Sequence, residues 1–209
     1  FVAGAFTGCL GDDDDDDKTT TDTSIKIGFL NPKTGPLEPD APGFSWGASE
    51  AIKDLNKLYP NETFELVEVD SGCDGAVAGP AAQTLVDSGV VAVTGAACSG
   101  ASMGANAILS AAGIPMISYA STNPGLSDAS AYPLFYRIVP SDALQGPAGA
   151  AMMKDAGVTN ESLAILHMTN DYGSGLADSV KGAWEADGKL CGAGMQGYEE
   201  KATNFDALV

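Results

Sequence analysis

Small hydroxyl-bearing residues stand in this sequence where apolar runs end and runs with helical spacing begin. Ser99 stands just before an alanine-rich segment, Ala120, Ser121 and Thr122 precede an Asn-Pro pair, and Tyr172 follows an Asn-Asp pair. The hydroxyl, amide N–H and carbonyl groups of such segments can hydrogen-bond a polar solute. The same residue types also cap helices and build turns. Solute binding and purely structural roles are therefore both open for these residues.

Candidates for catalysis are few. The chain has one histidine, His167, and it lies inside a predicted strand, where a core or rim position is expected. The sequence contains no Gly-x-Ser-x-Gly elbow, no Walker loop and no Gly-x-Gly-x-x-Gly run after a strand. We therefore predict that the protein is not an enzyme and needs no cofactor.

The four cysteines are Cys9, Cys73, Cys98 and Cys191. Cys73 and Cys98 follow neighbouring predicted parallel strands, so they can approach each other. A zinc site is the rival interpretation, but two cysteines and one histidine are too few ligands. For Cys191, a partner beyond Val209 and a buried free thiol are both open.

The chain is strongly acidic. Its formal charge is −18, which falls to −12 when the six aspartates at 12–17 are set aside. Such a surface repels nucleic acids and anionic lipid head groups, so nucleic-acid binding is not expected. No segment reaches the roughly 18 consecutive apolar residues of a membrane-spanning helix.

The start of the sequence indicates export. Residues 1–8 are apolar or small, and Cys9 follows them, an arrangement that resembles the lipobox of bacterial lipoproteins, in which the cysteine receives a lipid. The rival is an ordinary signal peptide with a chance cysteine. Residues 11–24 have no apolar periodicity, so we predict a hydrophilic tether. Part of it, 14–18, also resembles an engineered protease site.

The residues that follow alternate between strand and helix patterns. We predict strands at 25–30, 64–69, 90–93 and 115–118, and helices at 43–59, 75–88 and 101–112. Short connections in this order imply right-handed βαβ units on a parallel sheet. Ligands of such sheets bind at the carboxyl ends of the strands, where the hydroxyl-bearing loops lie.

The alternation restarts near 140, after an extended apolar segment at 132–140. Ser141 and Asp142 are expected to cap a helix that runs to 155. Further predicted elements are a strand at 162–167, a helix at 173–187, a strand at 190–197 and a helix that begins at Asn204. We predict an α/β protein with two lobes, 25–140 and an incomplete 141–209, joined by a hinge near 137–141 and preceded by the 1–24 export and linker segment.

Five short segments carry a resemblance to a known family. They are DSGCD at 70–74, GAACS at 95–99, SYASTNP at 118–124, RIVPSD at 137–142 and NDYG at 170–173. Together they resemble the periplasmic branched-chain amino-acid (Leu/Ile/Val) binding proteins of ABC transporters. The resemblance implies the type I periplasmic binding fold, with two Rossmann-like lobes that close on a solute. It also implies an extracytoplasmic protein that delivers an amino acid to a membrane permease.

The resemblance further implies a ligand set. The matching Ser99 touches the ligand carboxylate, the loop at Ala120, Ser121 and Thr122 holds the ligand, and the aromatic at Tyr172 covers it. The acid that pairs the ammonium is expected beyond Val209. Related proteins bind amides, urea or small aromatic and carboxylic acids, or act as sensors, and these are the alternatives.

The resemblance implies a disulfide between Cys73 and Cys98, which would also support Ser99. Three structural expectations complete the analysis. Trp46 should pack in the core, Asp171 should cap the helix that follows it, and the long segment at 34–46 should contact the ligand side chain.

Overall fold

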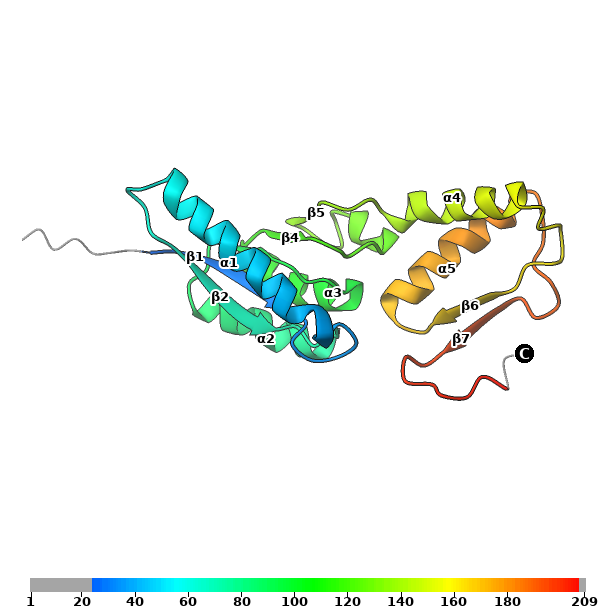
Figure 1. The fold of residues 1–209 in the computed structure, drawn as a ribbon, viewed down its shortest axis with the longest axis horizontal. Helices are drawn as coiled ribbons and strands as arrows, with labels where there is room; N and C mark the ends of the chain where they lie inside the picture. The colour runs from blue at the N-terminus through cyan, green and yellow to red at the C-terminus, as the bar shows by residue number, and fades with distance from the viewer. Residues whose placement is uncertain (1–23, 207–209) are drawn as a thin grey trace, which may run out of the picture.

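The computed structural model describes residues 24–206. Two α/β bodies follow one another along the chain and lie end to end in an elongated molecule (Figure 1). We call them the first lobe, residues 25–137, and the second lobe, residues 142–198. The predicted lipobox at Cys9 and nearly all of the tether lie outside the described residues.

The first lobe contains a parallel sheet of five strands. These are β1 (Ile25–Asn31), β2 (Phe64–Asp70), β3 (Ala92–Thr94), β4 (Met116–Ser118) and β5 (Phe135–Arg137). Their order across the sheet is β2-β1-β3-β4-β5, and every pairing is parallel. The extended segment predicted at 132–140 supplies the edge strand β5. The sheet therefore has one strand more than the four that the periodicity predicted.

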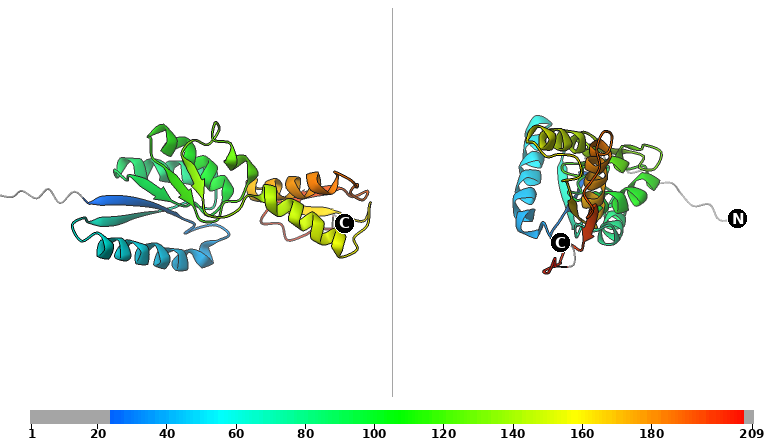
Figure 2. Two further views of the ribbon diagram at one scale, coloured as in Figure 1. Left: turned by 90° about the horizontal axis from the view of Figure 1, so that it is seen from above. Right: turned by 90° about the vertical axis from the view of Figure 1, so that its right-hand side faces the viewer.

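Helices cover both faces of this sheet. They are α1 (Ala41–Leu58), preceded by the short η1 (Glu38–Asp40), α2 (Gly75–Asp87) and α3 (Ser99–Ala111). Viewed along the sheet edge, α1 lies on one face, and α2 and α3 lie on the other (Figure 2). From β1 the chain passes to β2 on one side of the sheet, and then crosses to β3 on the other side of β1. The direction in which strands are added therefore reverses between β1 and β3. In open α/β sheets, such a reversal marks the ligand crevice.

The core of the first lobe is built from aliphatic strand residues and alanines of α2 and α3. Leu30, Val93 and Met116 of the sheet are buried against Leu85 and Leu109. Alanines at 78, 82, 101 and 105 are completely buried and allow the two helices to approach closely. At their crossing, a Cβ on Gly104 would lie 2.7 Å from the Cα of Gly75, so both positions require glycine.

The second lobe repeats the alternation on a smaller scale. It contains α4 (Asp142–Asp155), β6 (Ile165–Met168), α5 (Asp171–Trp184) and β7 (Met195–Tyr198), and the two strands pair in parallel. The helices α4 and α5 lie side by side, and a Cβ on Gly146 of α4 would lie 2.5 Å from the Ser179 Cβ of α5. None of the helices in the described part of the chain combines the length and apolar character that a membrane span requires.

One expectation about a single residue was wrong. Trp46 is 69% exposed on α1. Two residues after the inward-facing Phe44, it has turned about 200° around the helix, away from the sheet. The helix predicted from Asn204 stays a prediction: the Asn204 side chain accepts a hydrogen bond from the Asp206 N–H, as a helix cap does, and the residues after 206 lie outside the described part of the chain.

Candidate ligand-binding site

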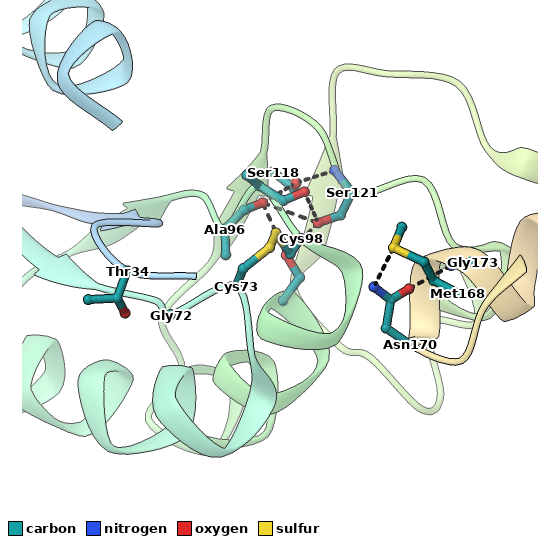
Figure 3. The surroundings of a disulfide bond; sticks show 12 residues. Thr34, Gly72, Cys73, Ala96, Cys98, Ser118, Ser121, Met168, Asn170 and Gly173 are labelled. Carbon is teal, nitrogen blue, oxygen red and sulfur yellow. Dashed lines mark hydrogen bonds between the residues drawn. A yellow bond between two sulfur atoms is a disulfide. The ribbon is translucent and has the colours of Figure 1, made fainter. Parts of the chain in front are cut away.

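The loops after β3 and β4 are held together by one carbonyl group. The hydroxyls of Ser118 and Ser121 lie 2.6 and 3.1 Å from Ala96 O, and the Ser102 hydroxyl of α3 lies 3.3 Å from it (Figure 3). Ser121 is 1% exposed, and its Oγ is also 2.8 Å from Ser102 Oγ. Its side chain therefore faces the interior and fixes the path of the loop, while Ala120 on the same loop is exposed.

Ser99 connects α3 to the loop after β4. It is the first residue of α3, and its buried Oγ accepts a hydrogen bond from Asn123 N at 3.2 Å. The N-cap is Cys98, so the cap interpretation of Ser99 was wrong. The reason is tertiary: the Ser99 hydroxyl bonds the neighbouring loop instead of its own helix. Ser99 thereby brings the start of α3 beside Thr122.

The disulfide expected from the resemblance is present between Cys73 and Cys98, whose Cα atoms are 5.1 Å apart. It connects the loop after β2 to the residue before Ser99 (Figure 3). Gly72 and Cys73 both have positive φ angles, 59° and 56°, which turn the chain sharply toward α3. The crosslink thus fixes the start of α3 from the β2 side.

Thr122 is half-buried and is bonded to the start of the second lobe. Its Oγ1 donates to Asp142 Oδ2 at 2.8 Å, and its carbonyl accepts from Asp142 N at 2.9 Å. Asp142 is completely buried. Burial raises the pKa of its carboxyl group, while the Thr122 hydrogen bond and the positive charge of Arg137 act in the opposite direction.

Tyr172 belongs to the first turn of α5 and is 39% exposed. The cap of α5 is Asn170, whose side chain accepts from Gly173 N at 2.8 Å, so the expectation that Asp171 is the cap was wrong. An amide one residue earlier reaches the free N–H group of the third helical residue. Asp171 contributes its carbonyl oxygen, which accepts from the Asn123 side chain at 2.6 Å. This bond brings Tyr172 next to the first lobe.

The segment after β1 is fixed by carboxylates of β2. Asp70 accepts from both N and Oγ1 of Thr34, at 3.1 and 2.7 Å. Glu68 accepts from Asn31 Nδ2 and Ser45 Oγ, each at 2.8 Å, and pairs with Lys33 at 3.3 Å. Burial opposes ionisation of Glu68, but these hydrogen bonds and the lysine outweigh it and lower its pKa.

A hollow of about 470 Å³ lies between the two lobes. It is lined by η2 (Pro124–Ser127) and Asn123 on one side and by α5, including Asp171 and Asp178, on the other. Its walls carry hydroxyl, amide and carboxylate groups. Within residues 24–206, no group of three or more His, Cys, Asp or Glu side chains could hold a metal ion.

Two residues that join the lobes were not singled out for this role from the sequence. Asn123 reads as part of an Asn-Pro turn, and Asp142 was expected, together with Ser141, to cap a helix. The turn is present, since Asn123 Oδ1 accepts from Gly125 N, whereas the cap of α4 is Ser141 and Asp142 is the first residue of the helix. Only the tertiary partners, Asp171 and Thr122, reveal the connection between the lobes.

The chain is similar in sequence to known proteins. A family model described as the receptor family ligand binding region matches residues 47–208. The chain belongs to this family. The leucine-, isoleucine-, valine-, threonine- and alanine-binding protein of Pseudomonas aeruginosa is 30% identical over 188 residues, which are 89% of this chain and 50% of that protein. The Leu/Ile/Val-binding protein of Escherichia coli K12 is 31% identical over 159 residues, 75% of this chain and 43% of that protein.

Solved structures of the same family confirm the fold. The substrate-binding protein LivJ of Streptococcus pneumoniae, in complex with isoleucine, superposes with a TM-score of 0.74 at 26% identity, over 88% of this chain and 52% of its own. The leucine-binding protein LivK of Thermotoga maritima gives a TM-score of 0.72 at 25% identity, over 88% and 51%. The expected type I periplasmic binding fold is therefore confirmed. The chain spans about half the length of these relatives.

Proposed function

We propose that the protein is an extracytoplasmic solute-binding protein of an ABC transporter. It captures a branched-chain or similar amino acid between its two lobes and delivers it to a membrane permease. The observation that carries the proposal is the position of the loop after β4. This loop presents Ala120 and Thr122 at the carboxyl end of the sheet and is bonded to both helices of the second lobe. Relatives with the same fold are named for binding leucine, isoleucine and valine.

The proposed contacts follow from the groups available. The Ala120 carbonyl accepts no hydrogen bond within the described part of the chain, so it can accept from a ligand ammonium. Thr122 Oγ1 can accept a second bond, and Ser99 stands at the start of α3, where N–H groups favour a carboxylate. Ser121 contributes by holding the loop. Tyr172 covers the ligand from the second lobe.

In this mechanism the protein binds and releases its solute without chemistry. Approach of the lobes surrounds the solute, and the closed form is the one that a permease recognises. We propose no catalytic residue. His167 lies in β6, where its Nδ1 is 2.8 Å from Met168 O, which is consistent with a structural role.

We propose further that Cys9 carries a lipid that anchors the protein to the outer face of a membrane. The support is the sequence before Cys9 and the hydrophilic residues after it. Metabolic labelling with an alkyne fatty acid should mark the wild-type protein and leave the Cys9→Ser variant unmarked. Equal labelling of both would contradict the anchor without affecting the solute site.

Titration calorimetry of the full-length protein tests the proposed function. Leucine, isoleucine, valine, threonine and alanine are compared with amides, urea and small aromatic acids. An amino acid should bind most tightly, and Thr122→Ala should weaken its binding at least about tenfold, the loss of one hydrogen bond to a charged group. Preferred binding of an amide or aromatic acid, or an unchanged affinity in Thr122→Ala, would overturn the assignment.

A further inference from the structure

Thr122 and Asp142 are hydrogen-bonded twice, across the junction of the lobes. Thr122 lies on the first-lobe loop after β4, and Asp142 is the first residue of α4 in the second lobe. One bond joins the two side chains at 2.8 Å, and the other joins Asp142 N to the Thr122 carbonyl at 2.9 Å. The main-chain bond sets the distance between the two segments. With that distance set, the side-chain bond fixes the orientation of the Thr122 hydroxyl.

Asp142 is placed differently from its counterpart in the other helix of the second lobe. Both Asp142 and Asp171 are first residues of a helix and follow a capping residue. Asp171 is exposed, whereas Asp142 is completely buried, and its Oδ1 has no hydrogen-bond partner among the described residues. An acid that only complemented the helix dipole would be more stable in water, because burying a charge with an unused acceptor costs free energy. The position of Asp142 therefore indicates a role toward Thr122.

The hydrogen bond from Thr122 to Asp142 uses the one hydrogen of the threonine hydroxyl. An ionised carboxylate can only accept hydrogen bonds, and a threonine hydroxyl has a single hydrogen. The Thr122 hydroxyl is the donor in this bond, and the charge of Arg137 opposes the rise in pKa that burial causes in the Asp142 carboxyl group. The Thr122 hydrogen is then committed to Asp142, and Oγ1 has only lone pairs left for a solute.

We propose that Asp142 is a positioning residue that makes Thr122 Oγ1 a hydrogen-bond acceptor only, and thereby selects solutes that present an N–H donor such as an ammonium group. The Ala120 carbonyl, two residues earlier on the same loop, is also an acceptor. The loop would then present two acceptors side by side, which favours an ammonium and disfavours a hydroxyl or carboxylate oxygen that brings no hydrogen. This inference rests on the proposed function, in which Thr122 contacts the solute.

Calorimetry of the full-length protein with leucine and with its deaminated analogue, 4-methylpentanoate, tests the inference. In Asp142→Asn, the amide can donate to Thr122 Oγ1 and release the hydroxyl hydrogen toward the solute. Leucine binding should weaken at least about tenfold, and binding of the analogue should change by less than about threefold. The preference for the ammonium-bearing solute should therefore fall, which a purely structural role of Asp142 would not cause.

One control variant and one alternative pair of variants accompany this comparison. Asp128→Asn removes one charge from an exposed site whose carboxylate accepts hydrogen bonds from Ser130 and Ala131, and it should leave both affinities unchanged. If Asp142→Asn does not fold, Thr122→Ser and Thr122→Val replace it. Serine keeps the hydroxyl and should keep the preference, whereas valine should lose it.

The outcomes separate the inference from the proposed function. Equal weakening of both solutes in Asp142→Asn overturns the inference alone. A preference retained in Thr122→Val overturns the inference and also the Thr122 contact of the proposed function. A wild-type protein that binds no ammonium-bearing solute overturns the proposed function and the inference together.

Discussion

The side chain of Asn123 donates a hydrogen bond of 2.6 Å to the carbonyl oxygen of Asp171, and so joins the loop after β4 to the first turn of α5. Every other polar group of Asn123 is engaged within the first lobe. Its N–H group bonds Ser99 Oγ, its Oδ1 accepts from Gly125 N, and its carbonyl accepts from Arg137 at 3.0 Å. The bond to Asp171 is therefore made from a rigid position, and its loss should loosen the lobes without unfolding the loop.

Asn123→Ala should shift the unliganded protein toward more open arrangements of its lobes. The variant also loses the bond from Gly125 N, which lies within the first lobe. The bond to Asp171 contributes about 0.5–1.5 kcal/mol, which changes an open-to-closed ratio by about two- to tenfold. Small-angle X-ray scattering should show a larger radius of gyration, and amide hydrogen exchange should accelerate at the start of α5. The matched control is Asn56→Ala, which removes two hydrogen bonds to Phe64 within the first lobe. Identical scattering from the two variants would contradict the role of Asn123.

Much of this fold can be predicted from the sequence, because most of its elements bury one face. The alternating apolar residues of β2 and the three-and-four spacing of α1 place both elements within two residues of their observed bounds. The last strand of each lobe is harder to predict. β5 has three residues, none of them fully buried, and the strand predicted at 190–197 is observed at Met195–Tyr198. Weaker burial leaves a weaker pattern in the sequence.

The candidate site was predictable in part. Ser99, Ala120 and Thr122 were assigned through the family resemblance of their segments, and their roles stay predictions. The structure places Ser99 at the start of α3, after β3, and the other two on the loop after β4. The pairs Thr122–Asp142 and Asn123–Asp171 were not predicted. Their members are 20 and 48 residues apart, and each residue also suits a local turn or helix start. A local sequence pattern cannot indicate whether a side chain bonds a neighbour in its own turn or a partner that is distant in sequence.

Gly104→Ala should destabilise the first lobe by about 1–3 kcal/mol. The new Cβ would lie 2.7 Å from the Gly75 Cα, and backbone cannot move aside as a flexible side chain can. Gly79→Ala is the matched control, because its Cβ would lie 3.8 Å from Gly104 O, an ordinary contact. A helical Gly→Ala change without a clash should be neutral or stabilising by up to about 1 kcal/mol. Urea unfolding of both variants measures the difference in stability. Equal unfolding midpoints for Gly104→Ala and Gly79→Ala would refute the close crossing of α2 and α3.

Cys73→Ser should lower the free energy of unfolding by about 3 kcal/mol under oxidising conditions, because the crosslink constrains the unfolded chain. Cys73 and Cys98 are 25 residues apart in sequence. Denaturant melts with and without a reducing agent provide the measurement, and the reductant should affect the wild type but not the variant. Cys191→Ser is the control, since Cys191 is a free thiol and its loss should leave the effect of the reductant intact. Sensitivity to reductant that persists in Cys73→Ser would argue against this pairing.

Glu68 should make the stability of the first lobe depend on pH in the acid range. Its pKa in the folded protein lies below the ordinary value of 4.5: burial acts to raise it, but the hydrogen bonds from Asn31, Ser45 and Lys33 together outweigh burial. A carboxyl group with a lowered folded pKa contributes stability above its unfolded pKa, and this contribution is lost as the pH falls through the folded pKa. Wild-type stability should therefore decline below about pH 5.

Glu68→Gln isolates that contribution. The amide cannot ionise, so the variant should be less stable than the wild type at pH 7, and the difference should shrink as the pH falls toward 3. Thermal unfolding midpoints across this range give the measurement. Glu65→Gln, on the exposed side of the same strand, should follow the wild-type profile. Asp70, which is held by Thr34 and Gly72, remains in every variant, so some acid sensitivity should persist in Glu68→Gln. A constant stability difference at all pH values would show that the Glu68 cluster acts through packing and not through its charge.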